Sequence, residues 1–232
     1  MTPDEFKEHE ELNKALNDQN LRDEYASAYD DYRPGLVARM LGAGFVGLGN
    51  LVYGRDPGYA KFRALEVIAR IPYQSWEVAS YTMLTYFYTD EQRAIELIKT
   101  GNFSRMAQDN ETMHVVVISQ IVKRLNCAGF FRHTLIPLVF AFVYFWLIYF
   151  IYLFSRKASL ELNYVFENHA YEQYQQFLED HQARLKITPL HSSFLDFYGR
   201  HIMREYDFFE SVRNDELIHR NRSIRELEAH IK

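Results

Sequence analysis

Two stretches decide the fold: DNETMHVVV, residues 109–117, and RNDELIHRN, residues 213–221. In each stretch a glutamate directly follows Asn110 or Asp215, and a histidine lies three residues after the glutamate. Residues at i and i+3 share one helix face, with Cβ atoms about 5–6 Å apart, so each stretch directs a carboxylate and an imidazole to one place. The repeated spacing predicts two helices that each contribute half of a shared site.

The paired residues, Glu111 with His114 and Glu216 with His219, are of the types that bind a pair of metal ions in helical bundles. Such bundles use two helices with Glu-x-x-His and two helices with a single glutamate. Four carboxylates and two imidazoles form a mostly oxygen ligand shell, which suits iron or manganese and leaves positions for dioxygen. The pattern favours a four-helix metal bundle, and the alternative is a set of ordinary acids on helix surfaces.

Two further segments offer the remaining acids. Glu66 lies inside the apolar run of FRALEVIARIPY, where an acid needs a partner such as a metal, and Glu77 follows it in SWEVASY. The segment YVFENHAYEQYQQF offers Glu167 and Glu172, and Glu161 precedes it. Spacing alone does not choose between these acids.

The composition favours an all-α chain with one core. Of the 232 residues, 48% are hydrophobic and 16% aromatic, with only 10 glycines, which suits long helices rather than a sandwich of strands. The net charge of −5 gives no reason to expect a nucleic-acid partner. The single cysteine, Cys127, excludes an internal disulfide and a cysteine metal cluster.

The chain is expected to divide at the turn Arg33-Pro34-Gly35, into an arm of residues 1–33 and a bundle domain of residues 34–232. The arm is predicted to be solvated and partly helical because it is rich in acids. It resembles neither a secretory signal nor an organelle transit peptide, which favours a bacterial, phage or trimmed origin. The acids of the arm are Asp4, Glu5, Glu8, Glu10, Glu11, Asp18, Asp23, Glu24, Asp30 and Asp31.

Two apolar segments predict contact with a membrane. Residues 36–54 are apolar but rich in glycine, which fits a helix lying on a membrane surface. Residues 134–154 carry no charge and are long enough to span a bilayer. The helix of this second segment is expected to continue without a break to about Glu179.

Other helix boundaries follow from local signals. A helix beginning near residue 59 is expected to kink at Pro72, and the next helix is expected to break at Gly101-Asn102. A last helix is predicted from about Leu195 to His219 or beyond.

Four segments resemble the alternative oxidases, most closely their plastid terminal oxidase branch of plastoquinol oxidases. They are ALEVIARIPY, NETMH, ENHAYEQYQQFL (preceded by YLFS) and YDFFESVRNDELIH, in the family's order over about residues 59–220. The resemblance selects Glu66 over Glu77 and selects Glu167 in the third segment. It implies a ferritin-like four-helix bundle with two iron ions, held by Glu66, Glu111, His114, Glu167, Glu216 and His219.

The resemblance also implies roles beside the irons. Tyr174 stands where the family has a tyrosine near the metals, two helical turns after Glu167 and therefore on the same face. It is expected to supply an electron and a proton during O–O cleavage, the alternative being a core tyrosine with one hydrogen bond. Asn110 and Asp215 are expected to orient ligands or link helices. Tyr152 matches a family tyrosine that we expect to be structural.

The expected quinol pocket departs from the family pattern. Lys61 replaces an arginine, which keeps the charge but loses the planar fork, and Gln173 stands where threonine is usual. Arg63 is a possible substitute that faces another way on the helix. The connection between residues 180 and 206 is shorter than in the plastid enzymes, so part of the pocket wall is expected to be missing.

The function implied is a quinol:oxygen oxidoreductase that oxidises plastoquinol or ubiquinol and makes water, insensitive to cyanide and without proton pumping. The resemblance implies a homodimer of monotopic chains on the cytoplasmic or stromal face of one leaflet. A simple membrane crossing at 134–154 is disfavoured because His114 and Glu167 must share one site. Quinol is expected to enter between segments 36–54 and 134–154.

Three alternatives remain open from the sequence. A quinone-ring hydroxylase with the same metal architecture would insert oxygen into its product. A ferritin-like iron-binding protein would not need the apolar segment 134–154. If the acids lie on the surface, the chain is a helical membrane protein without a metal.

Overall fold

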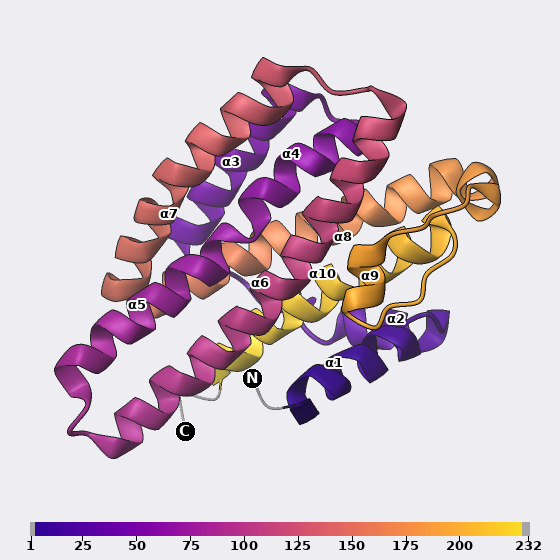
Figure 1. Cartoon of the computed structure of the whole chain (residues 1–232). Helices are drawn as coiled ribbons and strands as arrows, with labels where there is room; N and C mark the ends of the chain where they lie inside the picture. The colour runs from indigo at the N-terminus through magenta and orange to yellow at the C-terminus, as the bar shows by residue number, and fades with distance from the viewer. Residues whose placement is uncertain (1–2, 229–232) are drawn as a thin grey trace.

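The all-α prediction is confirmed by the computed structural model, which describes residues 3–228 and contains no strand within that range (Figure 1). The helices are α1 (Pro3–Ala15), α2 (Gln19–Ser27), α3 (Leu36–Tyr53), α4 (Tyr59–Ala69), α5 (Ile71–Phe87), α6 (Glu91–Leu125), the π-helix η1 (Phe131–Leu135), α7 (Ile136–Phe154), α8 (Arg156–Ile187), α9 (Ser193–Phe197) and α10 (Glu205–Glu228).

Four helices, α4, α6, α8 and α10, surround the residues of interest. Helix α10 packs along α8, and α6 packs against α4 and α5, so that α6 runs through the middle of the molecule (Figure 1). Two buried apolar clusters meet α6 on either side of Glu111. One contains Met113 and Val117, and the other contains Met106 and Ala107. The packing of both clusters fixes this part of α6 in the core.

Helix α6 is continuous, and the predicted break at Gly101-Asn102 is wrong. Asp90 caps its start by accepting a hydrogen bond from the backbone N–H of Arg93, and Asn126 ends it with a left-handed φ of 49°. A glycine inside a helix costs only about 1 kcal/mol relative to alanine. Burial of the flanking residues, such as Phe103, outweighs that cost.

The predicted single helix after residue 134 is also wrong, because it breaks at Ser155. This residue has an extended φ of −153°, and its hydroxyl accepts a hydrogen bond from the backbone N–H of Ala158, which caps α8. The apolar α7 and the ligand-bearing α8 are therefore separate elements. The kink predicted at Pro72 occurs just before it, at Arg70, and the proline lies in the first turn of α5.

The acidic segment is partly helical, as predicted, and most of its described acids are exposed, but one face of it is packed against the bundle. Helix α1 packs against α10 (Figure 1). His9, Asn13 and Leu16 are buried. His9 and Asn13 lie four residues apart on one face of α1, and Leu16 follows in the turn directly after the helix. Acids such as Glu11 lie on the other side of α1, in solvent. The domain boundary near residue 33 stays a prediction.

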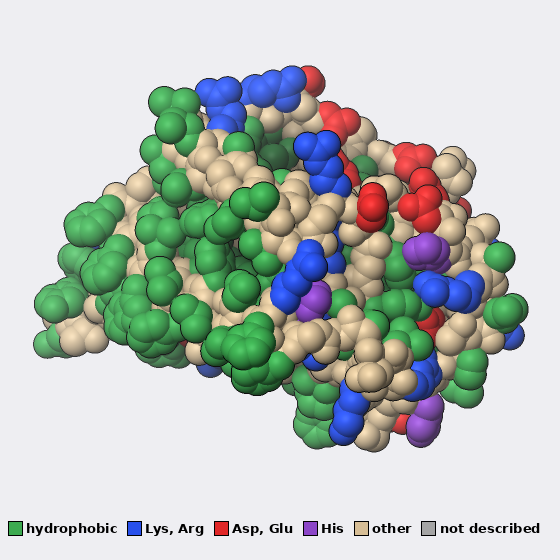
Figure 2. Space-filling view, turned by 90° about the horizontal axis from the view of Figure 1, so that it is seen from above, with side chains coloured by type: hydrophobic (Ala, Val, Ile, Leu, Met, Phe, Trp, Pro, Cys, Tyr) green, Lys and Arg blue, Asp and Glu red, His purple; other side chains and the backbone are tan. Residues whose placement is uncertain are grey.

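Two helices are long and apolar enough to cross a membrane, judged by length and composition alone. They are Leu36–Tyr53, with a mean hydropathy of 1.4, and Phe131–Phe154, with 2.2. Only 11% and 22% of these segments are buried inside the molecule. Figure 2 shows hydrophobic side chains gathered over one side and charged ones mainly over the other. This distribution suggests association with a membrane.

Candidate metal centre

The structure brings all six predicted ligand residues together in the buried middle of the bundle. Their ligand atoms form two groups, and within each group the atoms lie within 4.8 Å of one another. The first group is Glu66, Glu111, His114 and Glu216, and the second is Glu111, Glu167, Glu216 and His219. Because Glu111 and Glu216 belong to both, the geometry fits two adjacent metal ions bridged by two carboxylates.

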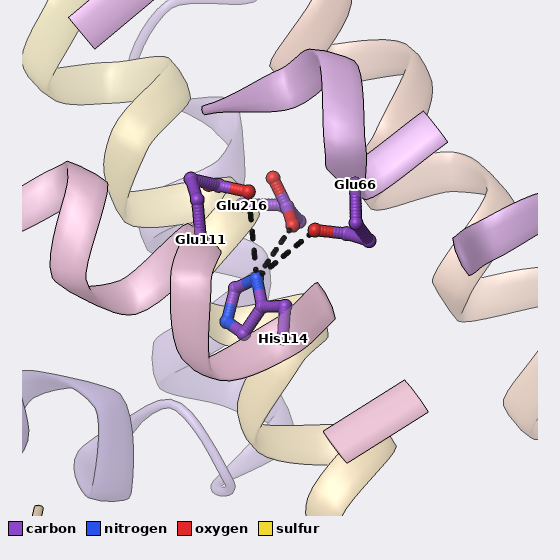
Figure 3. A group of neighbouring side chains, drawn as sticks. All are labelled: Glu66, Glu111, His114 and Glu216. Atoms are coloured by element: carbon purple, nitrogen blue, oxygen red, sulfur yellow. Dashed lines mark ion pairs between the residues drawn. The ribbon is translucent and has the colours of Figure 1, made fainter. Parts of the chain in front are cut away.

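The first group surrounds one ring nitrogen of His114, which faces carboxylates from α4, α6 and α10 (Figure 3). The distances from this nitrogen, Nδ1, are 3.4 Å to Oε2 of Glu66, 3.6 Å to Oε2 of Glu111 and 3.4 Å to Oε1 of Glu216. The other nitrogen, Nε2, lies 3.0 Å from Oδ2 of Asp215. When Nε2–H donates to Asp215, the lone pair of Nδ1 points at the metal position.

The second group is built around His219 and Glu167. Nδ1 of His219 lies 3.0 Å from Oε1 of Glu111. Oε1 of Glu167 accepts hydrogen bonds from the hydroxyl of Tyr73, at 2.6 Å, and from Nδ2 of Asn163, at 3.0 Å. These two donors hold the carboxylate in place beside the second position.

Many ligand atoms in this cluster are buried without a hydrogen-bond partner. They are Oε2 of Glu66, both carboxylate oxygens of Glu111 and Glu216, Nδ1 of His114 and both ring nitrogens of His219. Unpaired polar atoms in a protein interior are costly, and charged ones are more so. Bound cations would satisfy these atoms, and the hard oxygen donor set suits iron or manganese. The residues therefore fit a pair of metal ions.

The electrostatics of the cluster also call for positive charge. Burial raises the pKa of Glu66 to about 7, and burial together with the charges of Glu111 and Glu167 raises the pKa of Glu216 well above its usual range. Burial alone would also raise the pKa of Glu111, but the neighbouring imidazoles of His114 and His219 outweigh it and lower this pKa to about 2. The carboxylates thus compete for the limited positive charge around them.

Tyr174 lies against the first group, where its hydroxyl donates a hydrogen bond to Oε1 of Glu66. Its ring stacks on Phe62, with ring centroids 4.1 Å apart. Burial and the charge of Glu66 raise the pKa of Tyr174 well above its usual value, so the phenol stays protonated. Tyr152 is buried away from the ligands, with its ring packed against Trp76.

Asp215 is the centre of a network that sequence reasoning saw only in part. Its Oδ1 lies 2.7 Å from Nε2 of His9 and accepts from Nδ2 of Asn13 at 2.7 Å, and Arg200 donates to both of its oxygens. Asn110 contributes its Nδ2, 2.7 Å from Nε2 of His9. His9 and Asn13 were not predicted, because 206 and 202 residues separate them from Asp215 along the chain. Arg200, which lies 15 residues before Asp215, was also not predicted.

A cavity of about 250 Å³ leads to the metal ligands. Its walls are largely apolar and come mainly from α3, α4, α7 and α8, and they include Glu66, Glu167 and Tyr174. Lys61 and Gln173 both line it, and Nζ of Lys61 donates a 2.7 Å hydrogen bond to Oε1 of Gln173. The structure thus brings together the two residues predicted to contact quinol.

Two other sequence expectations do not touch this cavity. Arg63 is absent from its walls, since its guanidinium donates to the carbonyl oxygen of His133, at 2.6 Å, and to Oγ1 of Thr134, at 2.7 Å. Among the described residues, none between 180 and 206 lines the cavity. The expectation that the shorter connection leaves part of the pocket wall missing stays a prediction.

Comparison with known proteins agrees with this geometry. The family model for alternative oxidase matches residues 48–226, a range that includes all six ligand residues. A protein of Arabidopsis thaliana named "Ubiquinol oxidase 4, chloroplastic/chromoplastic" is 26% identical over 159 residues, which are 68% of this chain and 42% of the relative. The chain thus spans less than half the length of that relative. No solved structure matches the chain significantly. Because the family match covers most of the sequence, the chain belongs to the alternative oxidase family.

Proposed function

We propose that this protein is a membrane-bound quinol:oxygen oxidoreductase with a di-iron centre, which uses plastoquinol or ubiquinol. The proposal rests on one observation: the candidate metal ligands lie beside a largely apolar cavity. Two buried ligand groups that share Glu111 and Glu216 adjoin this cavity, because Glu66 and Glu167 line it. The same cavity is lined by residues of the two most apolar helices. A metal pair, an apolar substrate and a membrane are the parts that such an enzyme needs.

The reaction balances without another reactant. Two quinols lose four electrons and four protons and become two quinones, and one dioxygen takes up these electrons and protons and becomes two waters. When bound by the six ligand residues, the iron pair would supply the redox chemistry that passes electrons from quinol to dioxygen. Glu111 and Glu216, which belong to both ligand groups, would contribute to holding both ions.

The chain's own residues handle the proton and the substrate. Tyr174 lies in the wall of the cavity with its hydroxyl on Glu66, so a proton can pass between a bound substrate and this pair. Lys61 and Gln173 form a polar pair in a largely apolar wall, and we propose that they bind the oxygen atoms of the quinol head group. The walls of the cavity are largely apolar, which disfavours water beside the reacting groups.

The membrane arrangement that we propose is monotopic, on one leaflet. The exposed faces of α3 and α7 would lie in the lipid, and the bundle with its ligands would stay outside. The break at Ser155 supports this arrangement, because α7 can lie in the lipid while α8 turns away to carry Glu167. Quinol would enter from the lipid between α3 and α7, both of which line the cavity. Insensitivity to cyanide, the absence of proton pumping and a homodimer remain part of the proposal.

Oxygen uptake by the full chain in mild detergent tests the function. The iron-loaded protein is given a soluble quinol in the presence of cyanide, which blocks haem oxidases. The variant Glu167→Ala removes a ligand, and the matched control Glu161→Ala removes a buried acid that instead accepts from the hydroxyl of Tyr32. We expect uptake by wild type and the control, and none by Glu167→Ala. No uptake by iron-loaded wild type with several quinols would refute the proposal.

A further inference from the structure

The two metal positions differ in how their histidines are held. Nε2 of His114 is bound to Asp215 at 3.0 Å, whereas Nε2 of His219 has no hydrogen-bond partner among the residues that the structure describes. Both imidazoles are fully buried. A hydrogen bond on the far nitrogen fixes the orientation of a ligand histidine and makes it a better donor to the metal. Within the described part of the chain, His114 of the first position has such a hydrogen bond and His219 of the second does not.

Asp215 is itself held by the amino-terminal helix. His9 and Asn13 of α1 each place a nitrogen 2.7 Å from its Oδ1. Arg200 donates to Oδ2 at 2.6 Å and to Oδ1 at 3.0 Å, and it also donates to Oε1 of Glu10 on α1. The carboxylate is therefore fixed from two sides, and both sides include α1.

The residues of α1 that hold Asp215 lie outside the part of the chain that the family match covers. The match begins at residue 48, and His9, Glu10 and Asn13 precede it. The contact is nevertheless buried, because His9 and Asn13 are each only 4% exposed and Asp215 is fully buried. A solvated acidic tail would not bury a histidine and an asparagine against a carboxylate at the core.

We infer that α1 positions His114 through Asp215 and thereby makes the first ligand group, which contains Glu66 and His114, the tighter of the two metal positions. The inference rests on the metal centre of the proposed function. His9 and Asn13 are positioning residues, because they bind Asp215, which in turn binds His114. The ring of His9 also packs against that of His219, with centroids 5.8 Å apart, so the variant Asn13→Leu tests the link through Asp215 separately. Loss of an outer partner of a ligand histidine costs about 10–100-fold in metal affinity.

Titration of the metal-free full chain with Co²⁺ tests this inference without any measurement of oxidase activity. The visible absorption of the bound ion reports the ligands and geometry of each position. We expect wild type to bind two ions in two steps, and His9→Leu to weaken the tighter step by about tenfold or more. His9→Gln should restore much of it, because the glutamine amide can donate to Asp215. Glu11→Gln, on the exposed side of α1, is the matched control and should titrate as wild type.

The variant Glu167→Ala assigns the steps, since Glu167 belongs only to the second group, and it should abolish the weaker step. Asn13→Leu, which has nearly the same shape as asparagine, serves if His9→Leu does not fold. An unchanged titration in these folded α1 variants would overturn the inference. So would two equal affinities in wild type, or loss of the tighter step in Glu167→Ala. A wild type that binds no cobalt would instead refute the metal centre itself.

Discussion

The hydroxyl of Tyr174 donates a hydrogen bond to Glu66, one of the two candidate carboxylate ligands that belong to a single metal group. The other such ligand, Glu167, has an equivalent tyrosine, because Tyr73 donates to it at 2.6 Å. The two tyrosines differ in access to substrate. Tyr174 lines the cavity, whereas Tyr73 is not among its lining residues. Only the first tyrosine is placed to exchange a proton with a molecule in the cavity.

The variant Tyr174→Phe is expected to lower turnover by about 100-fold, the usual contribution of a positioned proton donor. Metal content should stay as in wild type, because the carboxylate of Glu66 remains. Tyr73→Phe is the matched control, and Asn163 still donates to Glu167 in that variant. Oxygen uptake and metal analysis of both variants check this prediction. Equal losses of turnover in the two variants would show that Tyr174 has no special role.

The shared carboxylates should matter more for metal content than the unshared ones. Glu111 and Glu216 each belong to both groups, so Glu111→Ala or Glu216→Ala is expected to lose both ions. Glu66→Ala or Glu167→Ala removes a ligand from one group and should leave about one ion per chain. Elemental analysis after dialysis measures the ratio. Glu161→Ala, a buried acid outside both groups, should keep both ions, and a bridging variant that keeps both would contradict the geometry.

Metal binding should stabilise the fold, because the unpaired buried carboxylates are satisfied only when cations are present. An ion at 100 times its dissociation constant contributes about 2.7 kcal/mol. For a chain of this size that corresponds to a rise in Tm of about 5–10 °C. Thermal unfolding with and without Fe²⁺ under anaerobic conditions measures the shift. The shift should vanish in Glu216→Ala. A wild-type Tm that is the same with and without Fe²⁺ would contradict a metal site in this cluster.

The exposed apolar face should anchor the protein to lipid. Phe142 and Phe150 on α7 are 69% and 49% exposed. Burial of one phenylalanine contributes about 1.5–3 kcal/mol, so an aspartate at either position should weaken binding by about tenfold or more. Sedimentation with phospholipid vesicles measures the partition. Gln182→Asp, on an exposed part of α8, adds the same charge elsewhere and should bind as wild type. Equal binding by all variants would exclude α7 as the anchor.

The polar pair in the cavity should affect substrate affinity rather than metal content. Lys61→Met removes the hydrogen bond to Gln173 and any charged contact with a quinol oxygen. A hydrogen bond to a charged group contributes about 1.5–3 kcal/mol, so the KM for quinol is expected to rise about tenfold or more. Lys157→Met, which is exposed on α8, is the control. A KM equal to that of wild type would remove Lys61 from the substrate site.

The ligand set could be predicted only with help from the family resemblance, and the structure shows why spacing was insufficient. Glu77 was a candidate from the pattern, but it is half-buried and pairs with Arg105 and Gln108. Glu161 is buried as deeply as the ligands, yet it accepts from the hydroxyl of Tyr32 and the backbone of Gly35. Burial and helical spacing alone do not distinguish a structural acid from a metal ligand.

The features that sequence reasoning missed depend on contacts between distant segments. The acids of residues 1–33 predict a solvated arm. The buried face of this segment could not be predicted, because the partner of His9 is Asp215, 206 residues away in the sequence. The break at Ser155 carries a local capping hydrogen bond, but the hydrophobic run hides it. Gly101 does not break α6, because the packing around the helix overrides the low helix propensity of glycine. Sequence patterns, together with the family resemblance, predicted the ligand residues. Contacts between distant segments determine which other residues hold these ligands in place.

The ratio of quinol oxidised to dioxygen consumed is the most direct test of the central proposal, that this chain reduces dioxygen fully to water. It is measured with the iron-loaded wild-type protein, a soluble quinol and ¹⁸O-labelled dioxygen, with mass spectrometry of the quinone. An oxidase consumes two quinols for each dioxygen and puts all of the label into water. Label in the quinone ring would contradict the proposal and identify the chain as a hydroxylase.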